Sequence, residues 1–118
     1  MTDKGALSSP LQARRCTPCE GGVPALERAQ AKRLLAQLAV GWQLDDEARE
    51  ISKDFTFKGF HRTMAFVNAL AWIAHRENHH PDFEVGYGHC RVRFSTHALG
   101  GLSENDFICA AKVDALNP

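Results

Sequence analysis

The chain has 118 residues, of which 44% are hydrophobic and 24% charged, a composition typical of one soluble globular domain. Its formal net charge is zero, so no overall field favours nucleic acid or an anionic membrane surface. The N-terminus lacks the apolar core of a secretory signal, and no apolar stretch approaches the roughly 18 residues of a membrane span. We therefore expect a cytoplasmic protein that contacts neither nucleic acid directly nor a membrane.

Two of the four cysteines form a CxxC motif within a polar N-terminal segment that contains Gly, Ser and Pro. We expect residues 1–23 to be a flexible extension of a domain that covers residues 24–118. Cys16 and Cys19 are then solvent-exposed thiols in a mobile tail, since disulfides are uncommon in cytosolic proteins. A redox role or a shared zinc site is the alternative, although the other two cysteines do not form the second close pair of a structural zinc site.

A helix and a pair of strands open the predicted domain. The helix is amphipathic over residues 25–39, with Pro24 in its first turn and Gly41 after its end. Apolar residues then alternate around Trp42 and again over residues 51–57, which predicts two short antiparallel strands on either side of an Asp-Asp-Glu turn.

The strongest helical pattern in the chain covers residues 59–79. Its apolar residues recur at three- and four-residue steps in two adjacent stripes, which begin at Phe60 and Phe66. Such a wide apolar face favours packing against a sheet on one side and against another subunit on the other. Pro81 disfavours helical geometry at the residue before it, so the helix is expected to end near His79.

A second pair of strands and a final helix complete the pattern. Residues 83–97 alternate between apolar and polar side chains on either side of Tyr87, which predicts a hairpin. Ser103 is a suitable N-cap for a last helix over residues 104–116. The order α-β-β-α-β-β-α predicts the α+β class, with a four-stranded antiparallel sheet and helices packed on one face.

Three histidines gather near the end of the central helix, within the sequence His-Arg-Glu-Asn-His-His-Pro at residues 75–81. His75 and His79 share a helix face at a spacing that zinc can use, but Arg76 takes the place of the glutamate in the H-E-x-x-H motif. Alternatively, histidines in a last turn cap free carbonyls and interact favourably with the helix dipole. That role explains a single histidine better than two consecutive ones followed by a proline.

Proton transfer is the third interpretation of these histidines. Imidazole gives and takes protons near neutral pH, and eliminating water requires one proton to be removed and another delivered. A histidine from another element would complete such a site, and His97 follows the last predicted strand. Strand alternation predicts that His97 emerges on the side away from Val92 and Phe94. Asp106, three residues after Ser103, fits the acidic position of a capping box, where its charge is favourable whatever else it does.

These residues match the signature of a known family. The signature is a polar or charged residue, three further residues and His-His-Pro, followed by an aromatic residue, a histidine ten residues beyond it and a more distant aspartate. In this chain its members are, in order, His75, His79, His80, Pro81, Tyr87, His97 and Asp106. From about residue 25 to residue 116 the chain resembles a bacterial-type member of the pterin-4a-carbinolamine dehydratase family, whose animal relatives double as a dimerisation cofactor of a homeodomain transcription factor.

The resemblance implies the fold predicted above and an enzyme, a hydro-lyase that dehydrates 4a-hydroxytetrahydrobiopterin to quinonoid dihydropterin. This reaction recycles the pterin cofactor of aromatic amino-acid hydroxylases such as phenylalanine hydroxylase. The family uses neither a metal nor an organic cofactor. A homodimer or homotetramer is implied as well, together with a functional link to an aromatic amino-acid hydroxylase.

The resemblance also implies roles for individual residues. His79, His80 and His97 are the implied catalytic residues, with His79 and His97 as the acid and base pair and His80 mainly orienting the pterin. The implied substrate-binding residues are His79, His80, Pro81, Tyr87, His97 and Asp106, and none is a metal ligand.

Two positions of this chain depart from the common pattern of the family. The signature commonly begins with an acidic residue and has Asp before the histidine pair, whereas this chain has His75 and Asn78. A carboxylate beside an imidazole raises its pKa and fixes its tautomer, so without one the histidines are expected to stay neutral more readily and the pH optimum to shift. Glu77 replaces the missing carboxylate only if the helix end reorients it.

A non-catalytic binding or assembly protein, or a coactivator, on the same fold is the alternative function, because family relatives include a transcription coactivator. Such a module does not need His79, His80 and His97 together, and its interactions would use the wide apolar face of the central helix. A metal-binding protein that uses either the histidine cluster or the CxxC motif is a third hypothesis.

Overall fold

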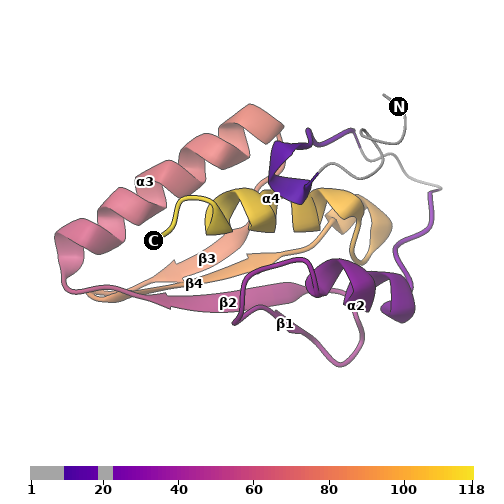
Figure 1. Cartoon of the computed structure of the whole chain (residues 1–118), viewed down its shortest axis with the longest axis horizontal. Helices are drawn as coiled ribbons and strands as arrows, with labels where there is room; N and C mark the ends of the chain where they lie inside the picture. Colours follow the sequence, from indigo (N-terminus) through magenta and orange to yellow (C-terminus); the bar gives the residue numbers. More distant parts are fainter. Residues whose placement is uncertain (1–9, 19–22) are drawn as a thin grey trace.

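The computed structural model describes residues 10–18 and 23–118, which form an α+β fold (Figure 1). In chain order the elements are η1 (Leu11–Ala13), α2 (Arg28–Leu35), β1 (Gln43–Leu44), β2 (Ile51–Thr56), α3 (Phe60–Glu77), β3 (Asp82–Val85), β4 (His89–Phe94), η2 (His97–Leu99) and α4 (Glu104–Asp114). The strands form one antiparallel sheet in the order β1-β2-β4-β3. The helices pack on one face of this sheet, with α4 in contact with both α3 and α2. The predicted fold class is therefore confirmed.

The helix-bearing face of the sheet is built from alternate residues of β2 and β4. Ile51 lies opposite Phe94, and Phe55 lies opposite Cys90, in an antiparallel register that places all four side chains in the core. Val92 lies between them and is fully buried. The alternation predicted for Cys90, Val92 and Phe94 is thus confirmed in β4, because successive side chains of a strand point to opposite faces, whereas all four residues of β3 are exposed.

Helix α4 forms the centre of the helical layer. Its residues from Asn105 to Ala111 are all buried, since the helix is covered by α3, α2 and the N-terminal segment as well as by the sheet. Helix α3 is covered on one side only: Phe66 and Leu70 are buried, whereas Phe60 and Trp72 are at least half exposed. None of the helices within the two described ranges is long and apolar enough to cross a lipid bilayer.

The first helix of the domain is shorter than predicted. Helix α2 begins at Arg28, because Glu27 serves as the N-cap and exchanges side-chain to backbone hydrogen bonds with Gln30 in a capping box. Leu26 lies before the helix, and its N–H donates to the Leu102 carbonyl at 2.8 Å. This tertiary hydrogen bond holds the preceding residues extended, where the amphipathic pattern alone predicted helix.

Residues 10–18, the described part of the N-terminal segment, pack against the domain, and we call them the N-terminal strap. Leu11 is only 2% exposed and packs with η1 against α4, and Lys112 Nζ donates to the Gln12 carbonyl at 2.8 Å. The flexible extension predicted for residues 1–23 is therefore wrong for this part, because the strap buries an apolar anchor in the core. Cys19, the second cysteine of the CxxC motif, lies outside the described residues.

Candidate active site

The end of helix α3 directs His79 toward the core. Asn78 adopts the left-handed conformation (φ 51°), and the His79 N–H donates to the Ala74 carbonyl at 3.2 Å, which closes the helix. The chain then reaches Pro81, which cannot continue a helix, and enters β3. The predicted helix end is confirmed within two residues, and it leaves the His79 ring parallel to the ring of Phe94.

The buried carboxylate of Asp106 holds His79 in place. Nε2 of His79 lies 2.6 Å from Oδ1 of Asp106, and the aspartate side chain is fully buried. Its other oxygen, Oδ2, accepts hydrogen bonds from the Thr96 hydroxyl at 2.8 Å and from the Ser103 N–H at 2.9 Å. Ser103 and Asp106 form the capping box that the sequence predicts at the start of α4. Asp106 therefore caps a helix and orients a histidine at once.

This arrangement selects the chemistry available to His79. Because an ionised carboxylate only accepts hydrogen bonds, an imidazole that is neutral beside it carries its proton on the nearer nitrogen, which for His79 is Nε2. The second ring nitrogen, Nδ1, is then a proton acceptor. The carboxylate expected to be missing at the end of α3 is thus supplied by Asp106 of α4, from 27 residues further along the chain.

A cavity of about 400 Å³ opens beside this histidine. It is lined by residues of three chain segments, namely the strap, the end of α3 and the region around η2 and α4. The lining residues are Arg15, Cys16, Thr17, Pro18, Arg76, Glu77, Asn78, His79, Thr96, His97, Ala98 and Asn105. The size suits a small organic molecule.

His97 lines the same cavity from η2. It is the first residue of η2, its side chain is 74% exposed, and its Nε2 lies 4.0 Å from Oδ2 of Asp82. Strand alternation does not apply to it, because β4 ends at Phe94. The structure therefore places both His79 and His97 in the lining of one cavity. His79 is held by Asp106, whereas His97 is accessible to solvent.

The remaining signature histidines lie outside this cavity. His80 is exposed, and its Nδ1 is 3.4 Å from the carbonyl oxygen of the neighbouring Pro81, which is itself buried. His75 lies on the outer surface of α3 with its ring beside that of Trp72. Within residues 10–18 and 23–118, no three His, Cys, Asp or Glu side chains gather as a metal site would require.

Tyr87 is not brought to the cavity either. It is 76% exposed in the β3–β4 turn, where its carbonyl accepts a hydrogen bond from Thr63 near the start of α3. His79 follows the other end of α3. The 18 residues of that helix span about 27 Å at roughly 1.5 Å per residue, so Tyr87 and His79 lie far apart. The separation arises because β3 carries the chain in extended form from the end of α3 back to the β3–β4 turn, where Tyr87 meets the start of that helix.

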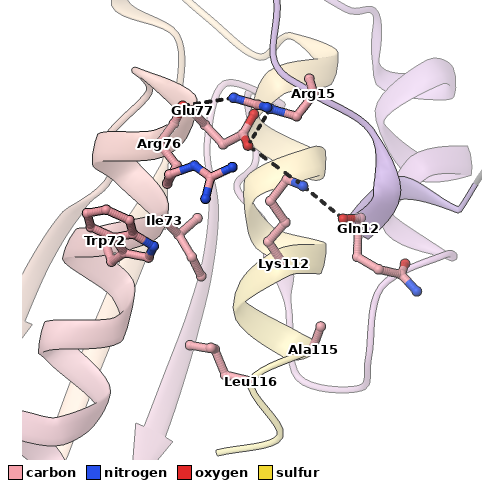
Figure 2. A pocket seen from close by; sticks show the side chains of 9 residues that line it. All are labelled: Gln12, Arg15, Trp72, Ile73, Arg76, Glu77, Lys112, Ala115 and Leu116. Carbon is pink, nitrogen blue, oxygen red and sulfur yellow. Dashed lines mark hydrogen bonds and ion pairs between the residues drawn. The ribbon is translucent and has the colours of Figure 1, made fainter.

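Glu77 is turned toward the strap and away from the histidines. Its side chain is 5% exposed, and its Oε1 accepts the Cys16 N–H at 2.8 Å. Its Oε2 lies 3.0 Å from Nε of Arg15 and 3.8 Å from Nζ of Lys112 (Figure 2). Burial alone would raise the pKa of Glu77, but the hydrogen bond from Cys16 and the two cationic neighbours outweigh it and hold the pKa below its usual 4.5. Glu77 therefore does not replace the missing acidic residue of the signature.

Sequence reasoning missed several parts of this site. Thr96 and Ser103 complete the hydrogen-bond network of Asp106, and the strap supplies one wall of the cavity. Ser103 was visible as a helix cap, but no local pattern marks Thr96 or the strap as parts of a site.

Comparisons with known proteins identify the family of the chain. The family model described as pterin 4 alpha carbinolamine dehydratase matches residues 24–116. A relative from Nitrosomonas europaea, provisionally named as a pterin-4-alpha-carbinolamine dehydratase, is 64% identical over 90% of this chain and 92% of its own length. A relative of the same provisional name from Legionella pneumophila (strain Corby) is 56% identical over 93% of this chain and 97% of its own length.

Two solved structures have the same fold. A transcriptional coactivator/pterin dehydratase from Brucella melitensis superposes with a TM-score of 0.75 at 30% identity, covering 80% of this chain and 99% of that one. A pterin dehydratase-like protein identified as a RuBisCO assembly factor in the alpha-carboxysome superposes with a TM-score of 0.56 at 27% identity, covering 64% of this chain and 88% of that one. From the family match and these identities, the chain belongs to the pterin 4 alpha carbinolamine dehydratase family.

Proposed function

We propose that this protein dehydrates pterin-4a-carbinolamine to quinonoid dihydropterin and water by histidine general acid and base catalysis. The observation that carries the proposal is the presence of two imidazoles in the lining of one cavity, with His79 held by buried Asp106 and His97 open to solvent. Family membership supplies the substrate class.

The proposed reaction moves two protons. His79 accepts the proton from ring N5 through its Nδ1, while the electron pair left on N5 forms the double bond to C4a. The C4a–O bond breaks, and His97 delivers a proton to the departing hydroxyl, which leaves as water. The carboxylate of Asp106 lies against the imidazolium that forms at His79, and His97 regains its proton from solvent because it is exposed.

The remaining signature residues have weaker support in this cavity. His80 is proposed to contact the pterin from the rim, and Pro81 to fix the turn that presents His79. Tyr87 is left out of the proposed site because it lies at the far end of α3. We further propose, from the resemblance, that the protein is cytoplasmic, self-associates and serves a pterin-dependent aromatic amino-acid hydroxylase.

An assembly or coactivator role is the competing function. It draws on the descriptions of the two solved relatives and on the exposed Phe60 and Trp72 of helix α3. A binding module would not require the buried carboxylate that orients His79, so the enzyme is the function that the site supports best.

The test is the rate at which purified protein converts freshly generated 4a-hydroxytetrahydropterin, with EDTA present. We expect strong acceleration by the wild type and a loss of about 10²–10⁴-fold in His79→Ala and in His97→Ala. His61→Ala is the control, because His61 is an exposed histidine at the opposite end of α3. No acceleration over buffer by folded protein would reject the enzyme and favour the binding module.

A further inference from the structure

We infer that the N-terminal strap is a substrate-contacting wall of the catalytic cavity, and that Glu77 and Asn105 are positioning residues that hold it there. The inference rests on the proposed function for the identity of the ligand, and it assigns residues outside the family signature to the site. Strap residues 15–18 line the cavity that contains His79 and His97.

Glu77 is the first anchor of the strap. Figure 2 shows its carboxylate between Arg15 of the strap and Lys112 of α4, and its other oxygen accepts the backbone N–H of Cys16. A buried carboxylate is unfavourable unless charges and donors surround it, and the strap supplies two of the three partners. The strap and Glu77 therefore hold each other in place.

Asn105 is the second anchor, and it forms hydrogen bonds with Thr17, the next residue of the strap. Its Oδ1 accepts the Thr17 N–H at 3.0 Å, and its Nδ2 donates to the Thr17 carbonyl at 2.6 Å. The Asn105 side chain thereby pairs with both backbone groups of one residue, as a neighbouring strand would. Asn105 directly precedes Asp106, so the strap is fixed to the same helical turn that holds His79.

The thiol of Cys16 makes the third contact. It lies 3.5 Å from the thiol of Cys109, which in turn lies 3.8 Å from the His79 carbonyl oxygen. The hydrogen bond with Cys16 and burial both raise the pKa of Cys109 above its usual range, so Cys109 remains a neutral thiol. The pair therefore acts as packing between the strap and the catalytic segment.

The expected consequence is a loss of binding without a loss of chemistry. The strap borders the cavity but provides neither the proton acceptor nor the proton donor of the proposed reaction. An interaction made equally with the ground state and the transition state changes KM and leaves kcat alone. Detaching the strap should therefore raise KM for the pterin with little change in kcat.

The first experiment removes a single backbone donor in the full chain. Cys16→Pro deletes the N–H that Glu77 accepts, whereas Cys16→Ser keeps that N–H and replaces only the thiol. We expect KM to rise about 5- to 20-fold in Cys16→Pro, with kcat within about twofold, and to rise less in Cys16→Ser. Glu77→Gln should also raise KM, and its matched control is Glu47→Gln, which makes the same change at an exposed carboxylate outside the cavity. An unchanged KM in both Cys16→Pro and Glu77→Gln would overturn the inference.

A second measurement needs no strap variant and no turnover. In a Cys19→Ser background, we would follow the alkylation rate of Cys16 by iodoacetamide with and without saturating 7,8-dihydrobiopterin, and measure binding of that pterin separately. Slower alkylation in the presence of bound pterin supports the inference. Binding without protection of Cys16 overturns it while leaving the proposed function intact. If the protein neither binds the pterin nor turns over the carbinolamine, the proposed function fails and this inference fails with it.

Discussion

Nε2 of His79 and Oδ1 of Asp106 lie 2.6 Å apart, although 27 residues and the β3–β4 hairpin separate them in the chain. The contact joins the C-terminal end of α3 to the N-terminal turn of α4. Because the aspartate is fully buried and also caps α4, its position is set by the fold before any ligand arrives.

Asp106→Asn is expected to lower kcat by about 10²-fold or more, since an amide nitrogen in place of Oδ1 would donate to Nε2 and reverse the tautomer of His79. Steady-state kinetics with the carbinolamine measures the loss. Ser103→Ala is the matched control, because it weakens the same helix cap without touching His79. The control should lose about 1 kcal/mol of unfolding free energy and keep its kcat. Equal losses of kcat in the two variants would show that Asp106 acts only through stability.

His80→Ala is expected to raise KM by a few-fold and to leave kcat within about threefold of wild type, in contrast to His79→Ala. The reason is the position of His80, which is exposed and outside the cavity lining, whereas His79 is held against Asp106. Parallel kcat and KM measurements on the two variants test this difference. A kcat for His80→Ala as low as that of His79→Ala would place a second proton-transfer group at the rim.

Glu77 is expected to make the stability of the protein sensitive to acid. Its pKa is lower in the folded protein than the usual 4.5, so its contribution is fully present above that value and is lost as the pH falls through the folded pKa. In urea unfolding, wild type should exceed Glu77→Gln in unfolding free energy near neutral pH, and the gap should narrow below about pH 4.5. A gap that stays constant down to acid pH would contradict this assignment.

Asp114→Ala is expected to destabilise the fold by about 3 kcal/mol, because the carboxylate, whose side chain is 13% exposed, serves three partners at once. It accepts the indole N–H of Trp42 at 3.0 Å and the Ala39 N–H at 3.0 Å, and it pairs with Lys53 at 3.3 Å. Removing it leaves a cation on the core face of β2 without its counter-ion. Thermal or urea unfolding gives the change in free energy.

The control for Asp114→Ala is Glu104→Gln, which removes an exposed carboxylate from its ion pair with Arg14. Exposed pairs contribute at most about 1 kcal/mol, so this variant should unfold close to wild type. A loss in Asp114→Ala no greater than that in Glu104→Gln would mean that Lys53 finds another partner or reaches solvent.

Cys90 is expected to resist thiol reagents in the native protein. It is fully buried on the helix-bearing face of the sheet, opposite Phe55 in the register, and burial raises its pKa to about 11. At about pH 8, partly exposed Cys16 should be alkylated while Cys90 stays unmodified until the protein is unfolded. Mass spectrometry of digests taken over time distinguishes the two sites, and alkylation of Cys90 as fast as that of Cys16 would contradict the placement of β4 in the core.

Local patterns in the sequence predict most of the helices and strands. The alternation in residues 83–97 predicts the β3–β4 hairpin, and the stripes of residues 59–79 predict α3, because each pattern has the repeat of its own backbone geometry. Pro81 sets the end of that helix for a reason internal to the chain, its missing N–H and its effect on the preceding residue. The first helix is the exception, since its start depends on the hydrogen bond from Leu26 to Leu102, 76 residues further along.

Some features of the candidate site were likewise predictable from the sequence, and others were not. The sequence by itself determined which residue types are present near the end of α3, and it marked Asp106 as part of a helix cap. Only the tertiary structure decided that this carboxylate meets His79, that Tyr87 lies at the far end of α3 and that the strap borders the cavity. The physical reason is that these relationships depend on how buried side chains pack and pair between distant segments, and such contacts leave no periodic trace in the chain.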